Sequence, residues 1–271
     1  MQIYQSIILG IIQGLTELLP ISSSAHLFLI PWFFNWQIPE AFDVALHFGT
    51  LLAIGLFFFK DWLGLIKGGY KSIIKKEKSL EGRMFWYIVI ATIPGGIIGY
   101  ILDKYAENLL TQPVIIAIAL MVMGLILYIV DKNSKNKTNY EELNFKQTFI
   151  VGLSQALAFI PGVSRSGITM TTGRILGIKR EAVAKYSFIL STPIVLAATV
   201  FKLNDFIEYF MIADMIGIIA FILGVLASFI VGIFVIKFLL EFLKKGSFKI
   251  FAIYRVIIGI IVLIAFWVRI L

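Results

Sequence analysis

The sequence predicts an all-α integral membrane protein, an inverted-topology repeat of six transmembrane helices and two re-entrant helical hairpins. Three observations lead to this fold class. Apolar residues make up 59% of the 271 residues, and the mean hydropathy of +0.94 is far above that of soluble domains. Polar residues interrupt two apolar segments at matching places, and the basic residues gather in a few loops.

Eight apolar segments follow one another along the chain. Six match the length of about 20 residues that crosses a hydrocarbon core, and they are residues 41–59, 85–103, 113–131, 184–201, 213–236 and 250–269. The other two, 2–34 and 147–176, each contain a proline and a serine-rich turn. We expect each to be two short helices that turn back at the break, where protein satisfies the broken backbone. A kinked spanning helix is the alternative for each.

The interrupted segments carry related motifs, QGLTELLPISSSAH and QALAFIPGVSRSG. Two broken helices at corresponding places predict a binding site near the bilayer midplane. When Pro20 is superposed on Pro161, the aligned pairs are Ser23 with Ser164 and Ser24 with Arg165.

The repeat divides the chain into two halves. Residues 1–131 hold hairpin 2–34 and three spans, and residues 147–271 hold hairpin 147–176 and three spans. The polar run 132–146 between them is expected to be a flexible linker. Because three is an odd number, the second half starts from the opposite side of the membrane, which makes the repeat inverted.

Basic residues are distributed unevenly between the two faces. Loops 60–83, 132–146, 174–185 and 237–249 hold nineteen Lys and Arg, whereas the opposite face holds three. The positive-inside rule places the basic loops in the cytoplasm. The first hairpin then dips in from outside and the second from inside. The net charge of +8 thus reflects topology, and nucleic acid is not an expected partner.

Glu17 is the only carboxylate in the first 39 residues and lies within an apolar helix. An ionisable residue inside the membrane costs about 3 kcal/mol and usually marks a functional site. Gln13 lies four residues earlier, on the same helical face. Together they offer a carboxylate and an amide oxygen to a hard divalent cation, Mg²⁺ or Ca²⁺. A protonated glutamate that bonds a neighbouring helix is the alternative.

Pro20 is followed by hydroxyls and an imidazole, at Ser22, Ser23, Ser24 and His26. Because proline ends one helix and serine caps the next, N–H groups and hydroxyls converge on a helix N-terminus, which suits an anion. The alternative is that a serine only caps the helix, but this would account for one of the three serines. His26 is a candidate general base toward a serine hydroxyl, or an acid toward a leaving group.

Arg165 is the only Arg or Lys between Lys146 and Arg174. A guanidinium near the midplane needs an anion, and phosphate suits its planar donors. A structural ion pair between Arg165 and Glu17 is the alternative. The two interpretations are compatible, because Arg165 can pair with Glu17 in the resting protein. The hydroxyls expected to line the site beside Arg165 are those of Ser164, Ser166 and Thr169.

Three residues outside the hairpins are interpreted as structural. Arg255 is near enough to a helix end to snorkel, and His47 and Asp43 lie beside the start of a span as interfacial residues. The absence of Cys excludes disulfides and Cys-ligated metals, and two His exclude a multi-His metal centre.

These motifs resemble the undecaprenyl-diphosphate phosphatases of the bacitracin-resistance type, over nearly the whole chain. The resemblance implies hydrolysis of undecaprenyl diphosphate to the monophosphate, which recycles the carrier for cell-wall synthesis. It also implies a divalent metal and a site that opens to the outer face of the bacterial plasma membrane. The segments that carry it are Gln13-x-x-x-Glu17, Pro20-Ile-Ser-Ser-Ser-Ala-His26 and Pro161-Gly-Val-Ser-Arg-Ser-Gly167.

The resemblance makes Glu17 the essential acid, and it places Gln13 where the family accepts Glu or Gln. A glutamine there removes one charge from the shared metal site. We favour Ser23 as the nucleophile, with His26 as its base and Arg165 steadying the phosphoryl oxygens. Attack by His26 itself or by an activated water is the alternative. The family's Ser-Arg pair matches Ser164 and Arg165.

A polyprenyl-phosphate transporter or flippase is the alternative function, because inverted repeats with broken helices are typical of transporters. Transport would depend on the charge of Arg165, whereas hydrolysis would also need Ser23 and His26. A purely structural protein would leave Glu17 and Arg165 unexplained. Small residues from Gly217 to Gly232 allow close helix packing, either within the chain or in a homodimer.

Overall fold

The computed structural model describes residues 1–270, and their side chains apart from those of residues 40, 99–100, 102–110 and 270. Leu271, the end of the predicted second half, lies outside this part. The regular elements of the described chain are all helices, and it contains no strands. In chain order the helices are α1 (Ile3–Thr16), α2 (Ser23–Phe34), α3 (Glu40–Phe57), α4 (Phe59–Ile74), α5 (Leu80–Leu110), α6 (Pro113–Asn133), η1 (Tyr140–Glu142), α7 (Phe145–Ser154), η2 (Gln155–Phe159), α8 (Arg165–Ile175), α9 (Arg180–Phe201), α10 (Leu203–Ile212), α11 (Met215–Lys245) and α12 (Lys249–Ile270).

Within the described residues, four helices are long and apolar enough to cross a membrane, namely α6, α9, α11 and α12. Helices α3 and α4 meet the same criterion as a pair, but the chain bends by 77° between them. The all-α membrane fold predicted from composition is therefore confirmed. The last four expected spans coincide with these helices, while the two expected at 41–59 and 85–103 correspond to α3 and to part of α5.

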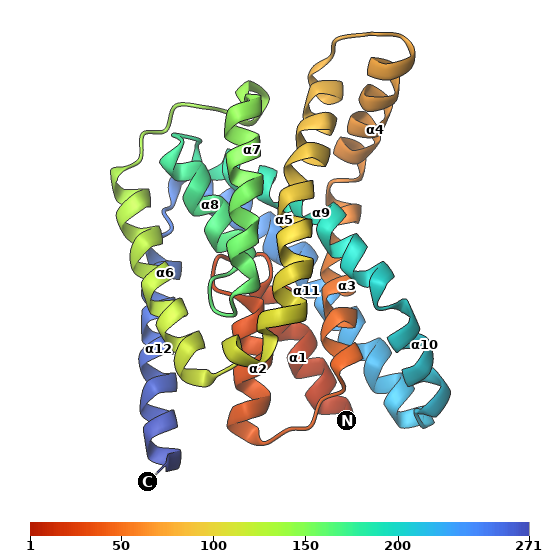
Figure 1. Cartoon of the computed structure of the whole chain (residues 1–271), viewed down its shortest axis with the longest axis vertical. Coiled ribbons are helices and arrows are strands. Elements are labelled where there is room, and N and C mark those ends of the chain that lie inside the picture. Colours follow the sequence, from red (N-terminus) through yellow and green to blue (C-terminus); the bar gives the residue numbers. More distant parts are fainter. Residues whose placement is uncertain (271) are drawn as a thin grey trace.

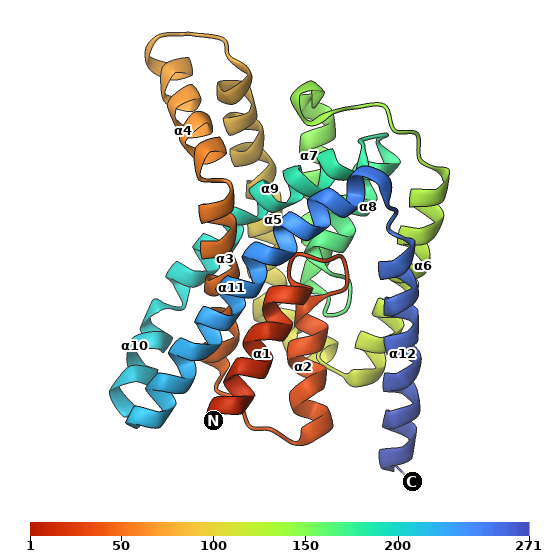
Figure 2. The same cartoon turned by 180° about the vertical axis from the view of Figure 1, so that it is seen from behind.

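Both interrupted segments form helical hairpins. Helices α1 and α2 pack against each other, as do α7 and α8, and the prolines lie in the turns between them. The two turns face each other near the middle of the molecule (Figures 1 and 2). The first hairpin reaches this point from the end where the N-terminus lies, and the second reaches it from the opposite end. Neither segment is a kinked continuous helix.

The serine caps of the two turns correct the predicted register of the repeat. Ser22 caps α2 at φ 76°, and Ser164 caps α8 at φ 73°, and each hydroxyl accepts a hydrogen bond from the N–H three residues later. The second turn has one more residue between its proline and its cap. Ser22 therefore corresponds to Ser164, and Ser23 corresponds to Arg165.

Small residues let α11 approach the first hairpin closely. A Cβ atom on Gly10 of α1 would lie 2.2 Å from the carbonyl oxygen of Gly224, and one on Gly49 of α3 would lie 2.6 Å from that of Val225. The Ser228 hydroxyl donates a hydrogen bond to the carbonyl of Leu46 at 2.8 Å. Helices α1 and α3 of the same chain thus occupy the small-residue face of α11, and the homodimer stays a prediction.

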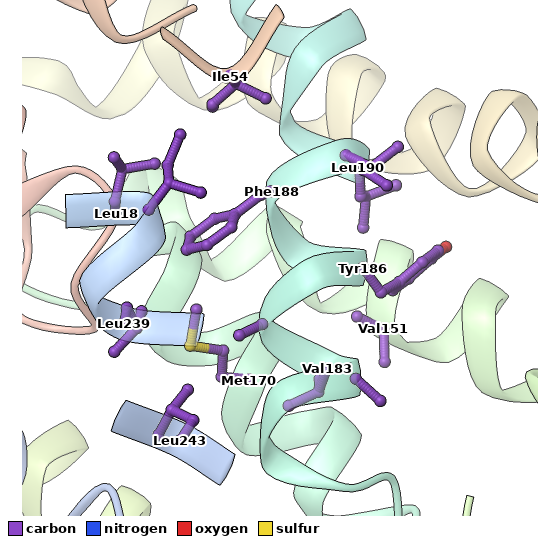
Figure 3. Packing of buried hydrophobic residues seen from close by; sticks show 14 of the residues in the cluster. Leu18, Ile54, Val151, Met170, Val183, Tyr186, Phe188, Leu190, Leu239 and Leu243 are labelled. Carbon is purple, nitrogen blue, oxygen red and sulfur yellow. The ribbon is translucent and has the colours of Figure 1, made fainter. Parts of the chain in front are cut away.

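The largest buried cluster surrounds α9 (Figure 3). Phe188 of α9 packs with Leu18, which follows Glu17, and with Leu239 of α11. Lipid tails are as apolar as these side chains, so close packing rather than transfer from water holds such helices together. The packing of Leu18 fixes the end of α1, and with it the position of Glu17.

A buried carboxylate fastens the polar segment between the halves. Asp131 accepts hydrogen bonds from Arg174 Nε at 2.9 Å, from Arg180 Nε at 2.8 Å and from the Phe248 N–H at 3.0 Å. Arg174 also donates to Asn136 Oδ1 at 2.7 Å. The segment 132–146 is thus bound to the end of α8, which corrects the expectation of a flexible linker.

Candidate active site

Glu17 lies at the end of α1, 7% exposed, and is the meeting point of the site. Its Oε1 accepts a hydrogen bond from Arg165 Nη2 at 2.5 Å. Its Oε2 accepts one from the Ser23 hydroxyl at 2.5 Å and one from Gln13 Nε2 at 3.2 Å, and it lies 3.3 Å from His47 Nε2. One carboxylate therefore joins α1, α2, α3 and α8.

Arg165 is the first residue of α8 and crosses from the second hairpin to the first. The structure shows the ion pair with Glu17 that the sequence left as an alternative. The second terminal nitrogen, Nη1, is buried and has no hydrogen-bond partner among the described residues. One face of the guanidinium thus holds Glu17, while a further donor is left for an anion.

The serines of the two turns are arranged in the same way. The hydroxyls of Ser22 and Ser24 lie 3.2 Å apart, and so do those of Ser164 and Ser166. The Ser166 hydroxyl also donates to the carbonyl of Leu19 at 3.0 Å, which joins the turns directly. Two helix N-termini, each with a serine cap, therefore lie beside Arg165 and Ser23.

Thr169 lies behind the site rather than on it. Its side chain is fully buried, and its hydroxyl donates to the carbonyl of Arg165 at 2.8 Å and lies 2.7 Å from the Ser187 hydroxyl of α9. This placement does not favour the predicted contact with phosphate. Thr169 instead fixes α8 against α9, and so orients Arg165.

His26 is buried, and its bonds run to partners other than Ser23. Nδ1 lies 2.7 Å from the carbonyl oxygen of Ser22, which can only accept, so Nδ1 carries the proton. Nε2 lies 2.8 Å from the Tyr254 hydroxyl, which is the donor when the ring is neutral. The two rings also stack, with centroids 5.7 Å apart. The predicted His26–Ser23 pair is therefore replaced by a His26–Tyr254 pair and a Glu17–Ser23 pair.

Arg255 of α12 is fully buried and does not snorkel to the interface, as its sequence position suggested. Nη1 donates to the carbonyl of Pro20 at 3.1 Å in the first turn. Nη2 donates to the carbonyls of Gly162 at 2.6 Å and Val163 at 3.0 Å in the second turn. Nε donates to the carbonyl of Leu120 in α6 at 3.2 Å. One side chain thus holds both hairpin turns together.

His47 was expected at the interface, and it lies in the site instead. Its Nδ1 lies 2.9 Å from the carbonyl oxygen of Asp43, one turn earlier, and its Nε2 faces Glu17. The side chain is 29% exposed, more than the 7% of Glu17. Sequence reasoning missed Tyr254 and interpreted His47 and Arg255 as structural, and the only indication for all three was a polar side chain within an apolar helix.

Comparison with known proteins decides the family. Residues 6–261 match the family described as "Bacitracin resistance protein BacA". This chain belongs to the BacA family. It is 47% identical over 265 residues to the undecaprenyl-diphosphatase of Pelotomaculum thermopropionicum, with 97% of each chain covered. It is 44% identical over 270 residues to that of Moorella thermoacetica, with 99% of this chain and 100% of the relative covered.

This BacA-family protein has few side chains that are placed to bind a metal ion. Among the described residues, no group of three or more His, Cys, Asp and Glu is placed to hold one. Gln13 Oε1 is buried without a hydrogen-bond partner there, one helical turn before Glu17. Mg²⁺ at phosphate sites is usually bound by one or two carboxylates, with waters and phosphate oxygens supplying the rest. Gln13 and Glu17 therefore fit a cation that is coordinated by both the protein and the substrate phosphate, rather than one bound by protein side chains alone.

Proposed function

We propose that this protein hydrolyses undecaprenyl diphosphate to undecaprenyl phosphate and inorganic phosphate, at the junction of its two hairpin turns. The observation that carries the proposal is the pair of contacts that Ser23 and Arg165 make with one carboxylate, that of Glu17. Relatives at 47% and 44% identity are named undecaprenyl-diphosphatase, and the apolar helices suit a lipid substrate. The activity recycles the lipid carrier for cell-wall synthesis and underlies bacitracin resistance, as the family's description indicates.

In the proposed mechanism Arg165 binds the terminal phosphoryl group. Its Nη1 donor has no partner within the described protein, and the N-termini of α2 and α8 add N–H groups beside it. Planar guanidinium donors suit phosphate oxygens and the charge that grows on them in the transition state.

Ser23 is the proposed nucleophile, and Glu17 is its base. The Ser23 hydroxyl already donates to Glu17 Oε2 at 2.5 Å, whereas His26 bonds Tyr254. As the proton passes to Glu17, the serine oxygen bonds the terminal phosphorus and the bond to the lipid monophosphate breaks. Water then cleaves the phosphoserine and releases inorganic phosphate. If water attacks the lipid directly, the same carboxylate would take its proton.

A divalent cation, Mg²⁺ or Ca²⁺, is proposed to bind through Glu17 and Gln13. When bound there it would neutralise phosphate charge and lower the repulsion that an incoming oxygen meets. The buried amide oxygen of Gln13, without a partner among the described residues, is the observation that supports this placement.

The proposed setting is the bacterial plasma membrane, crossed six times, with both hairpins re-entrant. In this proposal each half, 1–131 and 147–271, supplies one hairpin and three spans. It is supported by the two hairpins, which reach the middle of the molecule from opposite ends (Figure 1). The matching caps at Ser22 and Ser164 support an inverted repeat. The nineteen basic residues in four loops support a cytoplasmic position for these loops, and the first hairpin and the site would then open to the outer face.

Vesicles that contain the purified protein distinguish hydrolysis from transport. Phosphate release and the movement of labelled lipid between leaflets are measured together, with Mg²⁺ and with EDTA. We expect release by the wild type with Mg²⁺, and its loss in Ser23→Ala, Arg165→Ala and EDTA. A transporter would move lipid without releasing phosphate and would tolerate Ser23→Ala, an outcome that would refute the proposal.

A further inference from the structure

Helix α4 (Phe59–Ile74) lies apart from the hairpin turns, at the far end of the molecule (Figures 1 and 2). It follows α3 directly, and the chain bends by 77° between the two helices. Because of this bend, and because α4 has only 16 residues, α4 does not extend α3 into a longer span.

One face of α4 is packed against α5. A Cβ atom on Gly68 would lie 2.5 Å from the backbone nitrogen of Gly82, and one on Gly69 would lie 2.4 Å from the ring of Phe85. Leu65 is buried on the same face. The contact with α5 therefore fixes how α4 is rotated about its axis.

A second face of α4 is apolar and exposed. Its members are spaced by three, four or one residues, which gathers them on one side of a helix. We call them the apolar stripe. They are Phe59 (57% exposed), Leu63 (40%), Ile66 (53%), Tyr70 (64%), Ile73 (59%) and Ile74 (62%).

A third face of α4, beside the apolar stripe, is basic. Its lysines are exposed and recur at the same helical spacing, and Lys71 has Glu77 as a neighbour at 3.7 Å. Asp61 turns the other way and pairs with Lys185 at 2.7 Å. The basic face consists of Lys60, Lys67, Lys71 and Lys75.

We propose that α4 is an interfacial helix, bound to the surface of an anionic leaflet. The apolar stripe would lie at the boundary of the acyl chains, and the basic face would meet lipid phosphates. Apolar residues beside a row of lysines are typical of helices that lie in the interface. The four lysines belong to the most basic segment of the sequence, 60–83. The proposed topology puts this segment on the cytoplasmic side, where the membrane surface is anionic. This lipid-binding surface is separate from the hydrolytic site and does not depend on its chemistry.

The depth of α4 can be measured directly, because the chain has no Cys and single Cys substitutions can carry a nitroxide label. Ile66→Cys and Ile73→Cys place the label on the apolar stripe, and Lys71→Cys places it on the basic face. The protein is placed in phosphatidylcholine vesicles with about 25% phosphatidylglycerol, an anionic lipid. Label relaxation by oxygen, which enters the bilayer, is compared with relaxation by a water-soluble nickel complex.

We expect oxygen to dominate at Ile66 and Ile73, and the nickel complex to dominate at Lys71. Stripe labels that the nickel complex reaches would overturn the proposal, because the stripe would then face water. Stripe labels shielded from both reagents would also overturn it, because a protein or a second copy would then cover the stripe.

The role of the lysines is tested on the same labels. Replacing Lys60, Lys67 and Lys75 with Ser should make the label on Ile73→Cys more accessible to the nickel complex in the anionic vesicles. Replacing Lys135 and Lys137 in the linker, the matched control, should leave it unchanged. An equal response to both sets would overturn the assignment of the basic face to lipid phosphates.

Discussion

Arg165 Nη2 and Glu17 Oε1 lie 2.5 Å apart, although 148 positions separate the two residues in the chain. The contact joins the start of α8 to the end of α1, and thus the second hairpin to the first. A buried ion pair contributes little net stability, because desolvation offsets the attraction. The pair lies beside the N-termini of α2 and α8, and in the proposed mechanism both groups act on the phosphate of the substrate.

The roles of the serines in the first turn can be separated by two matched variants. Ser23→Ala removes the hydroxyl bonded to Glu17, whereas Ser24→Ala removes one that bonds only the Ser22 hydroxyl among the contacts of the turn. Loss of the nucleophile and its proton transfer should lower kcat by about 100-fold or more. Ser24→Ala removes one of the hydroxyls expected at the anion site but no contact with Glu17, and it should lower kcat by about tenfold or less. Equal effects in a phosphate-release assay would remove Ser23 from its role.

His47 should contribute through its contact with Glu17. A hydrogen bond to a charged group is worth about 1.5–3 kcal/mol, so His47→Ala should lower kcat/KM by about 10- to 100-fold. His47→Gln keeps an N–H donor and should lose less. The comparison is made by steady-state phosphate release. Equal losses in Ala and Gln would show that donation to Glu17 is not what His47 supplies.

Arg255 should matter for stability as well as for activity. Arg255→Met leaves the buried carbonyls of Pro20, Gly162 and Val163 without their donor. We expect the free energy of unfolding in detergent to fall by about 3–5 kcal/mol. The control is Arg269→Met, which removes an exposed guanidinium from the carbonyl of Trp32 and should cost under about 1 kcal/mol. Similar melting of both variants would argue against a clamp at the turns.

Asp131 gives a second test of stability, away from the site. Asp131→Ala removes the shared acceptor of Arg174 and Arg180 and leaves the buried guanidinium of Arg174 without a carboxylate to balance its charge. Such a change should destabilise the fold by about 3–5 kcal/mol. Asp205→Ala, which loses an exposed ion pair with Lys202, should cost under about 1 kcal/mol. A stable Asp131→Ala protein would show that the linker is not held in this way.

Metal dependence should respond to the charge at Gln13. Gln13→Glu adds a carboxylate beside Glu17 and should lower the Mg²⁺ concentration for half-maximal activity by about tenfold, because ligand charge tunes affinity. Gln13→Ala should raise it. Titration of EDTA-treated protein with Mg²⁺ measures both. A half-maximal concentration that is the same in all three proteins would place the cation elsewhere.

Local patterns were enough to predict much of the fold. Apolar length located the helices, and the prolines with their serines located both hairpin turns. A lone carboxylate and a lone guanidinium in apolar segments identified Glu17 and Arg165, and the structure brings them together. These features depend on residues close in sequence, or on the cost of burying charge.

The register of the repeat and three of the site residues depend on tertiary structure. The caps fix the register, and the second turn differs by one residue in length, which the sequence motifs do not reveal. His47, Tyr254 and Arg255 act because α3 and α12 pack at the level of the turns. Periodicity indicates which face of a helix is polar or small, but not which helix will lie against it.

The most direct test of a site shared by both hairpins is a double-mutant cycle on phosphate release from undecaprenyl diphosphate. Its members are the wild type, Glu17→Gln, Arg165→Gln and the double variant. Each single variant should fall to about 1% of the wild-type rate or lower, and the double variant should be no slower than the worse single, as for residues that act as a unit. Single effects that multiply in the double variant would contradict a common site.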